Sequence, residues 1–107
     1  MTFKMSPNIA VRTERFSEAV EFYSNVIGFK NRSTDPRQAD FEAGPINLLV
    51  IEDQEFHGPI QELFVDDLEA ARDQLIANGC KVRRWRGKGQ DCYIEDPFGV
   101  IFNLWEE

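Results

Sequence analysis

The 107-residue sequence predicts an α+β fold made of two similar β-α-β-β-β modules. Two segments carry apolar residues at helical spacing, each ends at a glycine, and short segments rich in β-forming residues surround both. Shifting the sequence by 52 positions aligns the two halves and pairs Phe16 with Leu68, Ala19 with Ala71, Phe41 with Tyr93 and Pro45 with Pro97. Because one such module is too small to bury its own helix and sheet, we expect a single domain over residues 1–107, with modules at about 6–53 and 59–107.

The first module starts with a strand and a helix. Residues 8–13 (NIAVRT) are rich in β-forming residues and predict a strand. From Phe16 to Ile27 the apolar residues recur every three or four positions, and Gly28 is typical of the position just past a helix. Phe22 widens this apolar stripe, so we expect the helix to be buried on more than one side.

Two strands and a connector follow the first helix. Residues 30–37 (KNRSTDPR) form a turn-rich stretch, whereas 38–44 and 46–52 have the pattern of strands. The polar segment 53–59 (DQEFHGP) is predicted to connect the two modules. Residues 60–65 (IQELFV) then begin the second module as a strand.

The second helix is predicted over residues 66–79. Either Asp66 or Asp67 can cap its first turn, because a side-chain carboxylate there accepts a hydrogen bond from the unpaired backbone N–H groups. Gly79 marks its end. The apolar stripe that we expect to face the sheet consists of Leu68, Ala71, Leu75 and Ile76.

The remaining residues predict three strands. Residues 80–86 and 90–95 flank the turn 87–89 (GKG). The sequence Asp-Pro-Phe-Gly at 96–99 places Asp, Pro and Gly at the first, second and fourth positions of a type I turn. Residues 100–105 (VIFNLW) form the last strand.

Composition restricts the class of protein. A hydrophobic fraction of 42% suits a globular domain, and no segment approaches the ~20 apolar residues needed to cross a membrane. The net charge of −7 disfavours nucleic acid as a partner. The first residues lack the apolar region of a secretory signal, and there are only two cysteines, Cys80 and Cys92, so we expect a cytoplasmic protein.

One basic cluster departs from the acidic composition. Five Lys and Arg residues surround Trp85 within residues 81–89 (KVRRWRGKG). Such a cluster can hold an anion or a flat ring by charge and stacking. It can equally be a solvated hairpin edge, where charged side chains prevent aggregation, and this is the more common role of such a run.

Alternation along the last strand assigns its side chains to two faces. Neighbouring residues of a strand point in opposite directions. Phe102 and Leu104 are therefore predicted to pack under the helix, whereas Ile101, Asn103 and Trp105 share the opposite face.

Three segments resemble the vicinal oxygen chelate superfamily, which includes glyoxalase I, extradiol dioxygenases, methylmalonyl-CoA epimerase and bleomycin resistance proteins. They are residues 8–29 (NIAVRTERFSEAVEFYSNVIGF), 63–79 (LFVDDLEAARDQLIANG) and 93–106 (YIEDPFGVIFNLWE). The resemblance implies two tandem βαβββ modules that form a cup-shaped, partly open mixed β-barrel with the helices outside. It also implies a ligand in the cup and a homodimer.

The resemblance assigns metal ligands to positions that this chain fills with neutral residues. The family histidines match Asn8 and Ile60, the closing glutamate matches Asn103, and the fourth position falls on Leu49 or Ile51. Two amides and two aliphatic side chains are a poor donor set for a divalent metal, so no metal and no cofactor is expected. The single histidine, His57, is predicted to lie in the connector.

Other chemistry is open to fewer residues. Glu62 shares a strand face with Phe64 and is the weak candidate for a catalytic acid or base. The favoured alternative is a half-exposed position at a strand end or an ion pair with an arginine such as Arg12. The two cysteines have no histidine nearby in sequence, so we interpret both as small apolar core residues.

Three functions follow, in order of preference. The first is a metal-independent protein that binds a small aromatic or cationic molecule in the cup, similar to bleomycin resistance proteins. The second is a lyase, isomerase or dioxygenase with unorthodox metal ligands or a glutamate acid or base, and the third is a non-catalytic subunit of a dimer. The predicted ligand-binding residues are Asn8, Arg12, Phe64, Trp85, Asn103 and Trp105.

Overall fold

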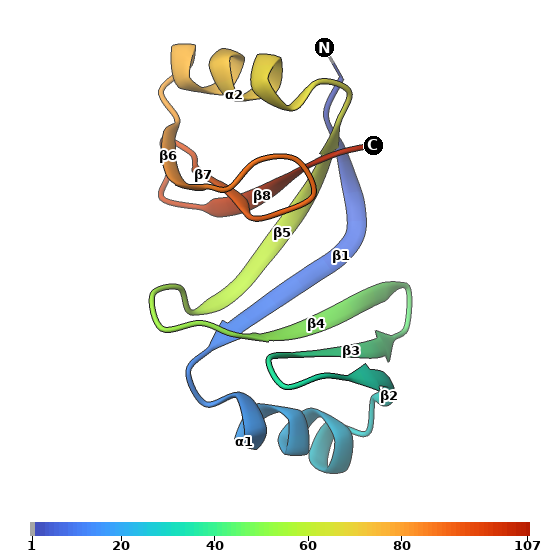
Figure 1. The fold of residues 1–107 in the computed structure, drawn as a ribbon. Helices are drawn as coiled ribbons and strands as arrows, with labels where there is room; N and C mark the ends of the chain where they lie inside the picture. Colours follow the sequence, from blue (N-terminus) through green and yellow to red (C-terminus); the bar gives the residue numbers. More distant parts are fainter. Residues whose placement is uncertain (1) are drawn as a thin grey trace. The chain divides into compact units, whose positions relative to one another are not determined.

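A computed structural model describes residues 2–107. The chain divides into two compact units, which we call the N-terminal unit (residues 7–60) and the C-terminal unit (residues 2–6 and 61–107). Along the chain the element order is strand, helix and three strands, given twice, and each unit combines a helix with a mixed sheet (Figure 1). The predicted α+β class is therefore confirmed.

The strands of the N-terminal unit follow the order β2-β3-β4-β1 within an eight-stranded sheet, with β1 parallel to β4 and the other pairs antiparallel. Its elements are β1 (Lys4–Thr13, the first residues of which belong to the C-terminal unit), α1 (Phe16–Glu21), η1 (Phe22–Ile27), β2 (Lys30–Thr34), β3 (Gln38–Ala43) and β4 (Ile46–Glu52). The core on the helix side is made of Phe16, Ala39, Phe41, Leu48 and Val50.

The first helix spans the predicted residues but changes its winding. After α1 the chain continues as a π-helix, η1, in which the N–H of Gly28 bonds the carbonyl of Tyr23 five residues earlier. Gly28 then adopts a left-handed conformation (φ 87°) that ends the helix, as predicted. The expectation that Phe22 is buried is wrong, because it is 47% exposed. Only one face of the helix meets the sheet, and Phe22 lies one residue before Tyr23, which packs on that core.

Residues 30–34, predicted as part of a turn-rich stretch, form strand β2 instead. All five residues are exposed, and a bulge between Asn31 and Ser33 interrupts the pairing with β3. A strand that ends a sheet and covers no core needs no apolar alternation, so its polar sequence resembled a turn.

The strands of the C-terminal unit follow the order β5-β8-β7-β6, with β5 parallel to β8 and the other pairs antiparallel. Its elements are β5 (Gly58–Val65, within this unit from Gln61), α2 (Leu68–Ala77), β6 (Lys81–Trp85), β7 (Cys92–Glu95) and β8 (Ile101–Glu106). Asp96 accepts hydrogen bonds from the backbone N–H groups of Phe98 and Val100, which confirms the predicted turn before β8.

Helix α2 has the predicted cap and stop. The Asp67 carboxylate accepts a hydrogen bond from the backbone N–H of Ala70 at 3.0 Å, which selects Asp67 over Asp66 as the cap. Gly79 has a φ of 96° just past the helix. Of the predicted stripe, Ile76 is 47% exposed, so that assignment is wrong; Leu68 and Ala71 fill the buried side of the helix.

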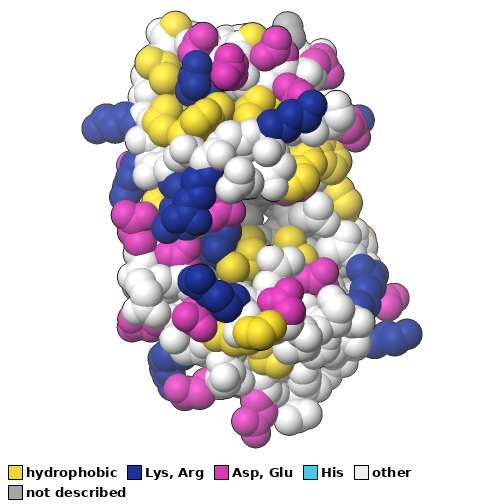
Figure 2. Space-filling model, in the orientation of Figure 1, with side chains coloured by type: hydrophobic (Ala, Val, Ile, Leu, Met, Phe, Trp, Pro, Cys, Tyr) yellow, Lys and Arg dark blue, Asp and Glu magenta, His cyan; other side chains and the backbone are white. Residues whose placement is uncertain are grey.

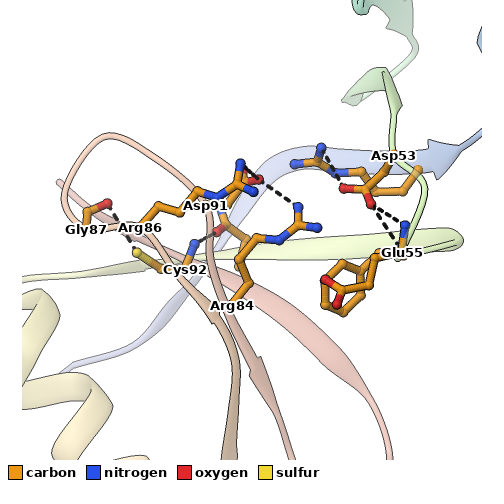
Figure 3. Close-up of polar contacts among 10 residues, drawn as sticks. Asp53, Glu55, Arg84, Arg86, Gly87, Asp91 and Cys92 are labelled. Carbon is orange, nitrogen blue, oxygen red and sulfur yellow. Dashed lines mark hydrogen bonds and ion pairs between the residues drawn. The ribbon is translucent and has the colours of Figure 1, made fainter.

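The core of the C-terminal unit joins α2 to one face of its sheet. Leu104 is buried in this core and Phe102 packs against it, as alternation predicted. Both cysteines are free and buried there, and burial raises the pKa of each thiol. The Cys92 thiol donates to the carbonyl of Gly87 at 3.2 Å (Figure 3). Their interpretation as core residues agrees with this placement.

The surface of the protein carries charges of both signs. Lys and Arg side chains alternate with Asp and Glu on the face drawn in Figure 2, so that face has no extended field of one sign despite the net charge of −7. Within residues 2–107, no helix is long and apolar enough to cross a membrane.

Candidate functional site

A row of polar side chains crosses the sheet of the C-terminal unit. Register pairs Glu62 on β5 with Asn103 on β8, Asn103 with Tyr93 on β7, and Tyr93 with Arg84 on β6. Directly paired residues of neighbouring strands share a face. Leu104, which follows Asn103 and therefore points the other way, lies in the core against α2. The row therefore occupies the face that α2 leaves open.

Asn103 lies at the centre of the row and is fixed by two hydrogen bonds. Its Oδ1 accepts from the backbone N–H of Cys92 at 2.8 Å, and its Nδ2 donates to Glu62 Oε2 at 3.5 Å. The first bond determines which end of the amide is oxygen, since only an acceptor can meet an N–H group. The Asn103 donor is thereby directed at a carboxylate.

Arg84 ends the row and is held by Asp91. The Asp91 carboxylate lies 3.1 Å from Arg84 Nη1 and 3.8 Å from Arg86 Nη1 (Figure 3). The guanidinium of Arg84 lies over the Tyr93 ring, 5.4 Å from its centroid. A bulge between Val82 and Arg84 makes this possible, because regular pairing would put the preceding arginine opposite Tyr93.

Aromatic side chains stand beside the polar row. Phe64 and Trp105 are paired with each other, two residues beyond the Glu62–Asn103 pair on β5 and β8. Both alternate with core residues, so they lie on the face that carries the row. The Lys4 ammonium lies 6.0 Å from the Phe64 ring centroid. Trp85 pairs with Cys92 and packs against the α2 core, where the Arg72 guanidinium lies 4.9 Å from its ring centroid. Trp85 is thus on the opposite face from Asn103.

Within the N-terminal unit, Asn8 belongs to a different polar cluster. Asn8 on β1 is paired with Asn47 on β4, and its Oδ1 accepts from Asn47 Nδ2 at 2.9 Å. Asn47 Oδ1 in turn accepts from Arg32 Nη1 at 2.6 Å. The amide oxygen of Asn8 is therefore already engaged, at one end of a hydrogen-bonded chain that runs through Asn47 to the Arg32 guanidinium.

Arg12 forms a buried ion pair with Asp53. The two side chains are 7% and 5% exposed, and Arg12 Nη1 lies 3.4 Å from Asp53 Oδ2. The other carboxylate oxygen, Oδ1, accepts from the backbone N–H groups of Glu55 at 2.8 Å and Phe56 at 3.0 Å (Figure 3). The predicted ion pair between Arg12 and Glu62 stays a prediction. His57 lies in the connector before β5, as expected.

The residues at the metal positions implied by the resemblance do not fit a divalent cation. The only ligating atoms of Asn8 and Asn103 are their amide oxygens, and each already accepts a hydrogen bond from within its own unit. Ile60 is buried, and Leu49 and Ile51 also offer no donor atom. Among the described residues, no group of three or more His, Cys, Asp or Glu side chains could hold a metal ion.

Sequence reasoning missed several residues of these clusters. Tyr93 and Arg84 belong to the polar row, Asn47 supports Asn8, and Asp53 neutralises Arg12. The shift that pairs the two halves aligned Phe41 with Tyr93, so a polar substitution at a repeated position was a usable signal. The partner of Arg12 carried no such signal, because it lies 41 residues away in a segment that reads as a polar connector.

Similarity to solved structures supports one fold. A hypothetical protein from Bacillus halodurans matches with a TM-score of 0.70 and 15% identity over 100% of this chain and 96% of its own. A glyoxalase/bleomycin resistance protein/dioxygenase superfamily member from Vibrio splendidus gives 0.66 and 13% over 99% and 100%. A methylmalonyl-CoA epimerase from Streptomyces coelicolor, bound to 2-nitronate-propionyl-CoA, gives 0.68 and 16% over 99% and 99%. These identities show the fold alone.

The comparison with curated proteins found no match. The family comparison, in contrast, covers nearly the whole sequence, because residues 8–105 match the model of the glyoxalase-like domain. The resemblance to the vicinal oxygen chelate superfamily is confirmed by this match and by the structural neighbours. The chain belongs to the glyoxalase-like domain family.

Proposed function

We propose that this protein binds a small cationic aromatic molecule without a metal, on the sheet face that carries Glu62, Asn103 and Trp105. One observation carries the proposal: a carboxylate and an oriented amide stand beside a pair of aromatic side chains on the same face. Apolar surface with a few placed polar groups is the usual composition of small-molecule sites. The homodimer and the cup enclosed by two modules stay predictions.

Charge selects the cationic ligand. Arg84, the cation of the row, is matched by the Asp91 carboxylate. Glu62 provides a carboxylate at the other end of the row, and one of its contacts is the long hydrogen bond of 3.5 Å from Asn103. A long hydrogen bond is weak, so a ligand ammonium can replace it at little cost. Trp105 and Phe64 can stack on the ligand ring or face its cation.

The direct test is a binding screen with matched ligands. Isothermal titration or thermal shift compares protonated aromatic amines with neutral and carboxylate analogues of the same ring. We expect binding of the amines, and a loss of about tenfold in affinity for Glu62→Gln, because the ion pair is removed. Trp105→Ala should weaken binding by roughly fivefold through lost stacking.

Phe98→Ala is the matched control for the aromatic variant. Phe98 is 88% exposed on the turn before β8, so its loss should not alter affinity. Preference for the carboxylate analogues, or equal affinity of the wild type and Glu62→Gln for the amines, contradicts the proposal. A stoichiometric transition metal in the purified protein, lost on Asn103→Ala, contradicts its metal-independent part.

A second candidate is proton transfer by Glu62. The observation in its favour is the same carboxylate, partly buried and bonded to an amide donor in a row that also contains Tyr93. In such a reaction Glu62 takes the proton from the carbon next to a substrate carbonyl and returns a proton to the same carbon after exchange with solvent. Since three structural neighbours are methylmalonyl-CoA epimerases, deuterium uptake by methylmalonyl-CoA in D₂O is the assay. Uptake that Glu62→Gln leaves unchanged excludes this role for Glu62.

A further inference from the structure

An open cleft of about 540 Å³ lies wholly within the N-terminal unit. It is bordered by the end of β1, the helix α1 with the start of η1, and the connector that leads into β5. Its volume falls within the range of about 300–1,000 Å³ typical of small-molecule sites. The cleft shares no residue with the row of Glu62, Asn103, Tyr93 and Arg84.

One wall of the cleft is aromatic and partly open to solvent. Phe22 and Tyr23 line it, with their ring centroids 5.6 Å apart and their planes at 80°. Tyr23 is itself stacked on Phe29 with parallel planes, so the wall is supported from behind by the core. The 47% exposure of Phe22 leaves ring surface available for another planar group.

The backbone that presents this wall is unusual. Phe22 and Tyr23 are the first residues of η1, the π-helical segment that continues α1. Short π-helical turns occur frequently at functional sites, where the wider turn displaces side chains from the α-helical positions. A regular helix of the same sequence would present these two rings differently to the cleft.

The charged groups of the cleft favour an anion. Arg12, Arg15 and His57 line it, together with a single carboxylate, that of Glu18. Arg15 pairs with Glu18, whereas Asp53, which pairs with Arg12, is not among the lining residues. The Arg15–Glu18 pair is exposed, at 71% and 66%, and an exposed ion pair is weak, so an anionic ligand can compete with Glu18 for the Arg15 guanidinium.

We propose that this cleft is a second binding site, which takes a small planar aromatic anion such as an aromatic carboxylate or sulfonate. The ring packs against Phe22 and Tyr23, and the anionic group lies toward His57 and the guanidinium groups. The site differs from the proposed function in position and in the charge of the ligand. It does not depend on binding at Glu62.

The test is a fluorescence titration of the full chain with 8-anilinonaphthalene-1-sulfonate, an aromatic anion whose emission rises in apolar surroundings. We expect saturable binding of one molecule per chain to the folded protein, with near-ultraviolet circular dichroism unchanged. Phe22→Ala should weaken it by roughly fivefold, because a stacking surface is lost. His57→Gln should weaken it by about threefold while keeping the connector polar.

Two controls separate this site from other exposed rings. Phe98→Ala removes a phenylalanine that is 88% exposed in the C-terminal unit, and Trp105→Ala removes the aromatic group of the proposed function. Both should leave the affinity unchanged. If either weakens binding as much as Phe22→Ala does, or if Phe22→Ala has no effect, the inference is wrong.

Chemical-shift mapping gives a readout that does not depend on any variant. The anion should perturb amide signals of residues 11–23 and 57–58, which border the cleft. A cationic aromatic dye of similar size should bind there more weakly, because it cannot replace Glu18 as the partner of Arg15. Equal binding of the two dyes, or perturbations confined to residues 61–107, overturns the assignment.

Discussion

The Arg12–Asp53 ion pair offers the sharpest quantitative prediction, because Asp53→Asn removes its charge and little else. Oδ2 faces Arg12, whereas Oδ1 accepts from the N–H groups of Glu55 and Phe56. An asparagine can keep Oδ1 in place and still hold the turn. It then presents an amide N–H₂ group to the guanidinium in place of a carboxylate oxygen.

The magnitude follows from the distance and the burial. Two unit charges 3.4 Å apart attract each other by about 5 kcal/mol at an effective dielectric constant of ~20. Removing one partner of a buried pair costs about 3–5 kcal/mol in measured cases, and side chains only 7% and 5% exposed belong to that class. We therefore expect Asp53→Asn to lower the free energy of unfolding by about 3 kcal/mol.

Urea unfolding followed by circular dichroism measures this loss. Asp53→Ala should cost about 1–2 kcal/mol more than Asp53→Asn, since both turn hydrogen bonds are lost as well. In the double variant Arg12→Met with Asp53→Asn, the buried charge is absent, so the two effects should not add. Glu18→Gln, in an exposed ion pair with Arg15, is the control and should give no measurable change. A loss below about 1 kcal/mol for Asp53→Asn, with additive effects in the double variant, would refute the reasoning.

Three further predictions concern the C-terminal unit. The two core cysteines have raised pKa values, so in the folded protein they should react slowly with a disulfide reagent at pH 8 and rapidly once urea unfolds the chain. The Lys88 ammonium and the backbone N–H of Leu68 lower the pKa of Glu106. The stabilising contribution of Glu106 is therefore present above its unfolded pKa and disappears as the pH falls through the lower folded value. The urea midpoints of wild type and Glu106→Gln should converge from pH 7 to pH 3, and parallel curves would count against this. Asn103→Asp keeps the acceptor for the backbone N–H of Cys92 but turns a carboxylate oxygen toward Glu62. Because the two like charges repel, it should lower the free energy of unfolding by about 1 kcal/mol at pH 7 and by less at pH 4. An equal loss at both pH values would contradict this account.

Local signals in the sequence predicted much of the fold. Gly28 and Gly79 mark the helix ends because both adopt φ values that other residues avoid. Asp67 caps α2 through a bond to a residue three positions away. Alternation placed Asn103 opposite the helix face because strand β8 is regular. In each case the interacting residues are close in sequence, or the pattern has a fixed period.

The missed features depend on interactions that no short window contains. Asp53 is buried because a guanidinium 41 residues earlier neutralises it, so its segment resembled an ordinary polar connector. Phe22 fits an apolar helical stripe, yet no element of the sheet covers it. The wider winding of η1 likewise leaves no mark that distinguishes it from an α-helix.

The bulge in β6 determines how this strand would tolerate the deletion of one residue. The extra residue lets Arg84 pair with Tyr93, and Arg83 instead reaches Glu95. Deleting either residue 83 or residue 84 would restore regular pairing and leave the remaining one opposite Tyr93. Because positions 83 and 84 are both arginine, that residue would again be an arginine. The two adjacent arginines therefore keep a guanidinium beside Tyr93 after a one-residue deletion. In most strands such a deletion would bring a different side chain to that face.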